Sequence, residues 1–234
     1  MHHSDSAIVT TVDALAKLLD VCGELRASEQ VDERAVTGCS FDSRAVSAGD
    51  VFFCKGAAFK PAFLRMALDA GAVAFVCEES LVESLEPLAQ ESGAAMLVVD
   101  SVRTAMALLP PEVYDRPDRD VKIVGITGTK GKTTAAFMLQ SIIKAAGESC
   151  GMIGSVSTDD GIECYESTNT TPEAPEVWRH IANCRTSGRQ SMVMEVSSQA
   201  LKYQRVENLP FDVACFLNIG RDHISPIEHP TFCL

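Results

Sequence analysis

Long apolar runs are missing from this sequence: no stretch approaches the roughly 18 consecutive apolar residues of a transmembrane helix. Residues 1–6 contain neither a basic segment nor an apolar one, so no secretory signal and no membrane insertion are expected. Nine cysteines are present but none forms a CxxC pair, which argues against a metal cluster or a disulfide framework. Without an export signal they predict reduced thiols and a cytoplasmic protein, with Cys54, Cys77, Cys150 and Cys215 as small core residues.

An excess of positive charge is also missing. The net charge is −12, and it is unevenly divided: residues 1–115 carry 18 acidic and 8 basic side chains, whereas residues 116–234 carry 14 and 12. An acidic chain without a basic stripe argues against a nucleic-acid partner. The nearly neutral second half is the part more compatible with a polyanionic ligand.

The most informative segment that is present is Gly125-Ile-Thr-Gly-Thr-Lys-Gly-Lys-Thr-Thr134, between an apolar run and a helical pattern. Strand, glycine-rich loop and helix in this order are typical of a phosphate-binding loop, whose backbone N–H groups cradle anionic oxygens. Lys132 would reach the β- and γ-phosphates, and the hydroxyl of Thr133 would bind Mg²⁺. A strict Walker A loop would have glycine where Ile126 stands. We therefore predict nucleoside triphosphate binding, with a purely structural turn as the alternative.

A domain boundary is predicted in residues 110–120, where three prolines and alternating charges disfavour both helix and strand. The expected organisation is a domain at 1–113, a linker at 114–120 and a second domain at 121–234. In the first domain the patterns predict helices at 12–21, 61–70 and 102–109 and strands at 36–41, 51–54, 72–77 and 95–99. In the second they predict helices at 132–146 and 174–186 and strands at 121–127, 150–157, 191–196 and 211–218.

These alternating elements predict the α/β class in both domains: a small N-terminal α/β domain, then a P-loop domain with a mostly parallel sheet and flanking helices. Three of the later strands are nearly continuous apolar runs, as in a parallel sheet that is buried on both faces. With only three or four core strands, this second sheet would be incomplete and would have an open edge. We therefore expect a partial, or unusually short, form of a longer protein.

Polar side chains follow two of the apolar strands. Glu195 lies at the carboxyl end of strand 191–196, where open α/β sheets bind ligands, so we expect it to bind Mg²⁺ beside Thr133, directly or through another ligand. A glutamate turning into solvent is the alternative. Asn218, Asp222 and His223 follow strand 211–218 and are candidates for binding a metal, a phosphate-bound water or an acyl group, although a lone histidine is more often structural.

Two further segments allow plainer interpretations. Ser167-Thr-Asn-Thr-Thr-Pro-Glu173 offers several hydroxyl donors before a helix, but the same residues also suit an N-cap with proline near the first turn. Phe41-Asp-Ser-Arg44 reads as a strand entering a turn, and nothing physical in it alone demands a ligand.

Taken in order, these segments resemble the Mur ligase family, and within it the MurE-type enzymes. Gly128-Thr-Lys-Gly-Lys-Thr133 is similar to the family's Gly-Thr-x-Gly-Lys-Thr loop, which also lacks the early glycine. Asp42-Ser-Arg44, Asn169-Thr-Thr-Pro-Glu173, Glu195-Val-Ser-Ser198 and residues 218–223 resemble its other blocks. The resemblance covers nearly the whole chain.

The resemblance implies an ATP- and Mg²⁺-dependent amide ligase of peptidoglycan precursor synthesis. The enzyme would join a free amino acid, expected to be L-lysine, to UDP-N-acetylmuramoyl-L-alanyl-D-glutamate through an acyl phosphate. An N-terminal domain would bind the uridine nucleotide, and a C-terminal domain that helps bind the amino acid would be absent from this chain.

The resemblance also implies roles for individual residues. Catalytic roles fall to Lys132, Glu195 and His223, and metal binding to Thr133, Glu195 and His223. ATP would be bound by Gly128, Thr129, Lys130, Gly131, Lys132, Thr133 and Thr134. The uridine part would contact Phe41, Ser43, Lys55, Ala57, Ala58 and Phe59. The muramoyl peptide would contact Asn169, Thr170, Thr171, Ser197 and Arg205.

Two departures from the family pattern carry consequences. Tyr203 stands where MurE-type enzymes often have glutamine, and the family's carbamylated lysine would lie beyond Leu234. We therefore expect this chain alone to bind its substrates but to catalyse the reaction with little turnover. Residues 222–230 and 53–59 resemble the lysine-adding branch; a meso-diaminopimelate-adding ligase and a non-catalytic nucleotide-binding fragment remain alternatives.

Two rival families are disfavoured. Residues 1–115 argue against a folylpolyglutamate-synthase-like ligase, which would lack a uridine-binding domain, and no Asn-Lys-x-Asp segment supports a GTPase. The oligomeric state is left open.

Overall fold

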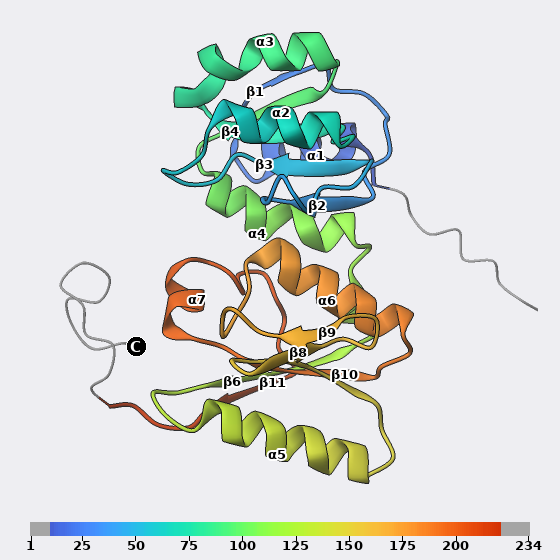
Figure 1. The fold of residues 1–234 in the computed structure, drawn as a ribbon, viewed down its shortest axis with the longest axis vertical. Helices are drawn as coiled ribbons and strands as arrows, with labels where there is room; N and C mark the ends of the chain where they lie inside the picture. The colour runs from blue at the N-terminus through green and yellow to red at the C-terminus, as the bar shows by residue number, and fades with distance from the viewer. Residues whose placement is uncertain (1–9, 221–234) are drawn as a thin grey trace, which may run out of the picture. The chain divides into compact units, whose positions relative to one another are not determined.

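The computed structural model describes residues 10–220 and divides into two compact units, Met1–Arg116 and Pro117–Leu234 (Figure 1). Each unit contains a sheet of its own with flanking helices, so the predicted α/β class is confirmed. Within the described residues, no helix is both long and apolar enough to cross a membrane.

The first unit is built on a five-stranded sheet in the order β1-β5-β4-β3-β2. Four strands run parallel, and β1 pairs antiparallel with β5 at the edge. The strands are β1 (Leu25–Glu29), β2 (Gly38–Ser40), β3 (Asp50–Phe53), β4 (Ala74–Glu78) and β5 (Ala95–Val99). The helices are α1 (Val12–Val21), α2 (Pro61–Asp69), α3 (Val82–Ser92) and α4 (Val102–Val113), with a 3₁₀ turn, η1 (Glu79–Leu81).

The sheet of the first unit has an apolar core on each face because successive strand residues point to opposite sides. Val51 and Phe53 pack with the cluster that includes residues of α1 and α4. Phe52, between them, packs with the cluster that includes residues of α2 and α3. A sheet buried on both faces explains why its strands read as continuous apolar runs in the sequence.

The first residues of the predicted seam at 110–120, which were expected to disfavour helix, are helical. Helix α4 continues through Pro110 and Pro111 to Val113, and both prolines are buried. Each proline removes one N–H donor, but both lie in the last turns of the helix. Their carbonyls still accept bonds, from Tyr114 N at 3.0 Å and from Arg116 N at 2.8 Å. Burial of the rings thus favours the helix where local propensity does not.

The second unit is built on a six-stranded sheet in the order β11-β6-β10-β7-β8-β9. The first four of these are parallel, and β8 and β9 continue the sheet antiparallel. The strands are β6 (Lys122–Thr127), β7 (Cys150–Ile153), β8 (Ser157–Asp159), β9 (Cys164–Glu166), β10 (Ser191–Glu195) and β11 (Val213–Phe216). Helices α5 (Lys132–Ala145) and α6 (Ala174–Thr186) lie on opposite faces of the sheet (Figure 1), with α7 (Ser198–Lys202) and a 3₁₀ turn, η2 (Pro117–Arg119).

The strand predicted at 150–157 is two strands. β7 ends at Ile153, and the chain turns so that Gly154 N donates to Ser157 O at 3.1 Å and β8 returns antiparallel. The turn brings residues 154 and 155 to the carboxyl end of the parallel strands, beside the end of β10.

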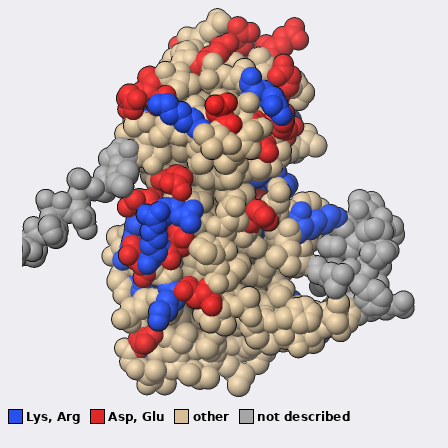
Figure 2. Space-filling model, turned by 180° about the vertical axis from the view of Figure 1, so that it is seen from behind, with Lys and Arg blue, Asp and Glu red and all other residues tan. Residues whose placement is uncertain are grey.

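Charged side chains of both signs are interspersed on the face drawn in Figure 2. Ion pairs among the described residues include Arg65–Glu91 and Arg189–Asp159. The cysteines expected in the core are fully buried at Cys54, Cys77 and Cys150, whereas Cys215 on the edge strand β11 is only half-buried. Burial raises the pKa of the Cys77 thiol to about 12, so that thiol stays protonated at neutral pH.

Candidate functional site

The glycine-rich loop connects β6 to α5, as the sequence predicted. Gly131 precedes the helix with φ of 89°, a left-handed conformation that favours glycine, and Lys132 is the first helical residue. Lys132 Nζ donates to the carbonyl of Gly128 at 2.7 Å, so its ammonium lies over the loop. The loop thereby combines a helix N-terminus with a cation at one place, which is the chemistry that binds phosphate.

A buried carboxylate lies beside this loop. β10 and β6 are parallel neighbours with Glu195 opposite Ile126, so Glu195 ends its strand next to the start of the loop. Glu195 is fully buried, and its Oε2 accepts hydrogen bonds from Thr133 Oγ1 at 2.9 Å and from Ser155 Oγ at 3.2 Å. Its Oε1 accepts from Ser155 N at 2.8 Å. These hydroxyl and carboxylate oxygens are the hard ligands that Mg²⁺ prefers, so the side chains present fit the predicted metal.

The position of Glu195 depends on two residues that the sequence analysis missed. A Cβ on Gly154 would lie 2.5 Å from Glu195 Oε1, so only glycine leaves room for the carboxylate. Ser155 holds both carboxylate oxygens, and its hydroxyl also donates to Thr170 Oγ1 at 3.0 Å. The available signal was a Gly-Ser pair that directly follows the next buried strand in the sequence after the P-loop strand.

Asn218 holds the P-loop in place. Its Oδ1 accepts from Lys130 N at 3.0 Å, and its Nδ2 donates to Lys130 O at 2.9 Å. Nearby, Thr129 Oγ1 accepts from Gly220 N at 2.9 Å. The amide that we considered as a metal or water ligand is therefore engaged with the backbone of the loop. Asp222 and His223, named with it, lie outside the described residues.

The segment before α6 packs against the end of β10. Glu173 is the N-cap of α6 and forms a capping box with Glu176, so the helix is capped by this glutamate and not by a hydroxyl of the segment. Thr171 is fully buried; its hydroxyl donates to Glu195 O at 2.8 Å and accepts from Ser197 N at 3.1 Å. Ser197 itself caps α7 by accepting from Ala200 N at 3.1 Å. The hydroxyls of Thr171 and Ser197 thus hold the segment to the strand.

Arg205 also holds this segment. Its Nε lies 3.0 Å from Glu173 Oε1 and its Nη1 donates to Thr171 O at 2.9 Å, with the side chain 16% exposed. Arg205 therefore has a carboxylate partner within the chain at the place where we predicted a substrate anion. Asn169, at the other end of the segment, is exposed and lines a small cavity of about 40 Å³ with Tyr165 and Ser167.

A separate pocket in the first unit gathers most of the residues predicted to bind uridine. It has a volume of about 440 Å³ and is lined by Phe41, Asp42, Ser43, Arg44, Phe52, Lys55, Ala58, Phe59, Phe63 and Met66. Lys55 Nζ lies 4.7 Å from the centroid of the Phe41 ring, and Phe59 meets Phe63 edge to face with centroids 6.5 Å apart. Ala57 is exposed and does not line the pocket.

Sequence reasoning missed the part of this pocket contributed by α2 and β3. Phe63 and Met66 lie on α2, where their spacing of three residues places them on one helical face. Both remain partly exposed, at 39% and 47%, which distinguishes them from the core-facing residues of the same helix. A pocket lined by aromatic rings together with Lys55 and Arg44 suits a planar base joined to an anionic group.

Comparisons with known proteins agree with this geometry. Residues 126–232 match the Mur ligase middle domain. A UDP-N-acetylmuramoyl-L-alanyl-D-glutamate–L-lysine ligase of Enterococcus faecalis is 42% identical over 210 residues, covering 89% of this chain and 40% of the relative. The ligase of that name from Streptococcus suis is 37% identical over 229 residues, covering 95% of this chain and 46% of the relative. The chain thus spans less than half the length of these curated relatives.

Solved structures share the fold at lower identity. A UDP-N-acetylmuramoyl-L-alanyl-D-glutamate–2,6-diaminopimelate ligase has a TM-score of 0.69 and 19% identity, covering 93% of this chain and 42% of that one. MurF ligase from Thermotoga maritima, in complex with ADP, has a TM-score of 0.54 and 23% identity, covering 81% of this chain and 39% of that one.

Proposed function

Because this chain belongs to the Mur ligase family, we propose that it forms the nucleotide- and substrate-binding part of an ATP-dependent amide ligase in the cytoplasm. The ligase adds a free amino acid, L-lysine, to UDP-N-acetylmuramoyl-L-alanyl-D-glutamate. The observation that carries this proposal is the buried Glu195 carboxylate beside Thr133 and the P-loop, in a chain 42% identical to a named lysine-adding ligase.

Each part of the second unit has a role in this proposal. The P-loop residues 128–134 bind the triphosphate through backbone N–H groups, and Lys132 neutralises its charge. Thr133 and Glu195 hold Mg²⁺, which supplies positive charge at the phosphates. His223, proposed to hold a second metal, lies outside the described residues. Catalysis in this scheme is mainly positioning and charge neutralisation.

The reaction joins the substrate carboxylate and an amine in two steps. The D-glutamate carboxylate displaces ADP from the γ-phosphate, which gives an acyl phosphate. The amine of the amino acid then attacks the acyl carbon, phosphate leaves, and an amide forms. The muramoyl peptide is placed by Asn169 and Thr170, while Thr171, Ser197 and Arg205 keep the Asn169–Glu173 segment in position.

The first unit binds the uridine end of the same substrate. The base packs on the aromatic side chains of the 440 Å³ pocket, and Lys55 at its edge pairs with the diphosphate. Ser43, whose hydroxyl lies 4.0 Å from the soft sulfur of Met66, supplies a polar contact to the ligand.

A calorimetric titration of this chain tests the proposal directly. We expect UDP-N-acetylmuramoyl-L-alanyl-D-glutamate to bind more tightly than UMP or UDP-N-acetylglucosamine, and MgATP to bind independently, with little turnover by this chain alone. Equal binding of all three uridine ligands would restrict recognition to uridine and contradict the assigned substrate. Tight MgATP binding without any uridine ligand would instead support a nucleotide-binding fragment.

A further inference from the structure

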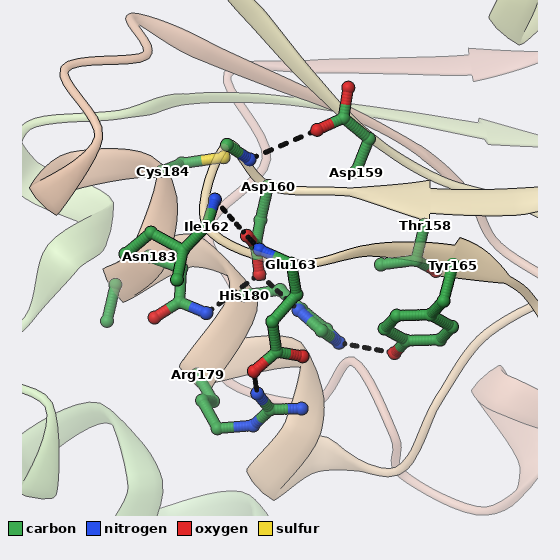
Figure 3. Close-up of polar contacts among 12 residues, drawn as sticks. Thr158, Asp159, Asp160, Ile162, Glu163, Tyr165, Arg179, His180, Asn183 and Cys184 are labelled. Atoms are coloured by element: carbon green, nitrogen blue, oxygen red, sulfur yellow. Dashed lines mark hydrogen bonds and ion pairs between the residues drawn. The ribbon is translucent and has the colours of Figure 1, made fainter.

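The turn between β8 and β9 contains a fully buried aspartate that no part of the proposed mechanism uses (Figure 3). Asp160 Oδ2 accepts from His180 Nδ1 at 2.6 Å and from Asn183 Nδ2 at 2.8 Å, both on α6. Asp160 Oδ1 accepts from the backbone N–H groups of Ile162 and Glu163 at 2.9 and 2.7 Å. The other ring nitrogen of the fully buried His180, Nε2, lies 2.9 Å from Tyr165 Oη on β9.

Asp160, His180 and Tyr165 form a hydrogen-bonded chain that begins at a buried carboxylate. Burial alone would raise the pKa of Asp160, but hydrogen bonds from His180, the Glu163 amide, Asn183 and the Ile162 amide hold it well below its usual range. Asp160 is therefore an anion that only accepts, and Nδ1 of His180 carries the proton. The other ring nitrogen, Nε2, holds the Tyr165 hydroxyl at 2.9 Å.

The hydroxyl oxygen of Tyr165 is left with acceptor capacity at the edge of a cavity. Tyr165 is 40% exposed and lines the 40 Å³ cavity together with Thr158, Ser167, Asn169 and Glu176. Asn169 is the residue predicted to contact the muramoyl peptide. With one hydrogen bond made to His180, the Tyr165 hydroxyl oxygen still has a lone pair that can accept from a group that enters this cavity.

From this geometry we propose that Tyr165 is a specificity-determining residue of the peptide site. Its hydroxyl oxygen accepts a hydrogen bond from an N–H or O–H group of the muramoyl peptide, and Asp160 and His180 are positioning residues that hold the hydroxyl in place. The inference rests on the proposed function, since it names a further contact of the same substrate.

A metal site is the competing interpretation of these side chains. Ligand atoms of Asp160, Glu163 and His180 lie within 4.8 Å of one another. However, the Asp160 oxygens already accept four hydrogen bonds, and Glu163 pairs with Arg179. These partners compensate the charges of the two carboxylates and occupy the lone pairs that a metal ion would need. Hydrogen bonds and one ion pair therefore account for the cluster without a metal ion.

The decisive variant is Tyr165→Phe, which keeps the ring and removes only the hydroxyl. Titration calorimetry should show about tenfold weaker binding of UDP-N-acetylmuramoyl-L-alanyl-D-glutamate, as expected for one lost hydrogen bond. Binding of UMP and of MgATP should not change, because neither ligand carries the peptide. Tyr114→Phe is the matched control: it removes a tyrosine hydroxyl that accepts from Cys39 N in the first unit, and it should leave the preference for the dipeptide nucleotide intact.

A second variant tests whether His180 positions the Tyr165 hydroxyl or only stabilises the fold. His180→Asn can still donate an N–H to Asp160, but its shorter side chain lacks the second ring nitrogen that holds Tyr165, so the hydroxyl is released to point elsewhere. We expect it to weaken dipeptide binding while UMP and MgATP binding persist, and the double variant with Tyr165→Phe to be no weaker than Tyr165→Phe alone.

The outcomes separate the inference from the function on which it rests. Unchanged dipeptide binding by Tyr165→Phe, with the wild-type chain still preferring the dipeptide nucleotide over UMP, would overturn the inference and leave the proposed function standing. Equal losses for dipeptide nucleotide, UMP and MgATP would mean that Tyr165 serves the fold and would overturn it too. A wild-type chain without that preference would overturn both.

Discussion

At the scale of single residues, the unusual feature is a glutamate that is fully buried among neutral donors. The hydrogen-bond partners of the Glu195 carboxylate are two hydroxyls and one amide, none of which carries positive charge. A buried carboxylate in such surroundings is destabilising unless a cation compensates it. Thr133 Oγ1 also has lone pairs to offer, so a divalent cation between the two side chains would complete the site.

Replacing Glu195 with glutamine should therefore uncouple the nucleotide from the metal. Glutamine can accept from Ser155 N and donate to the hydroxyls, so we expect a folded chain. The affinity for MgATP should fall about tenfold or more, while the affinity for ATP in the presence of a chelator should be nearly unchanged. Titration calorimetry with and without Mg²⁺ measures both values.

Gly154→Ala is a second route to the same result, because its Cβ would displace the Glu195 carboxylate. Equal losses of MgATP and metal-free ATP affinity in the glutamine variant would contradict a metal-binding role for Glu195 and favour a purely structural one.

At the scale of elements, the helix and strand bounds predicted from the sequence are most accurate where one residue pattern dominates. The predicted bounds of α1, α6 and β5 match the structure because amphipathic or continuous apolar runs are bounded there by clear caps and turns. The hairpin β8–β9 has strands of three mostly polar residues and so no alternation to detect. Helix α3 was missed because acidic residues and Pro87 interrupt its apolar stripe.

The residues of the candidate site divide in the same way, into those that a sequence pattern identifies and those that only the fold brings together. Thr133 and Glu195 were found because a loop motif and a strand end identify them in the sequence. Ser155, Tyr165 and His180 were not found, since only the turn after β7 and the folding of the β8–β9 hairpin beside α6 bring them to the site.

The hairpin should depend on the charge of Asp160. The folded state lowers the pKa of this carboxyl, so its stabilisation is fully present above the unfolded value of about 3.9 and is lost as the pH falls through the folded value. Asp160→Asn should reduce the free energy of unfolding by about 2 kcal/mol at pH 7. The difference from wild type should stay constant down to about pH 5 and shrink at lower pH.

Urea unfolding between pH 7 and pH 3 measures this difference. Asp159→Asn is the matched control, because the neighbouring Asp159 pairs with Arg189 at a partly exposed position, where an ion pair contributes little. A difference between wild type and Asp160→Asn that persists unchanged at pH 3 would show that the charge of Asp160 is not what stabilises the turn.

At the scale of the whole molecule, the chain consists of two units whose cores are separate. The first unit has an apolar cluster on each face of its own sheet, and the second has a cluster between α5 and its parallel strands. The 440 Å³ pocket is lined only by residues 41–66, and the P-loop with Glu195 only by residues of the second unit. Each proposed binding function thus belongs to one unit and can be tested in it.

A fragment of residues 1–116 should therefore fold and bind uridine nucleotides by itself. Its sheet is buried on both faces by its own helices, so we expect one cooperative unfolding transition. UMP should bind the fragment and the whole chain with the same affinity, whereas MgATP should bind only the whole chain. Lys55→Ala should weaken UMP binding by the fragment about tenfold, through the lost charge at the pocket edge. A folded fragment that does not bind UMP would contradict the assignment of this pocket to uridine, and a fragment that remains unfolded would show that the first unit needs the second.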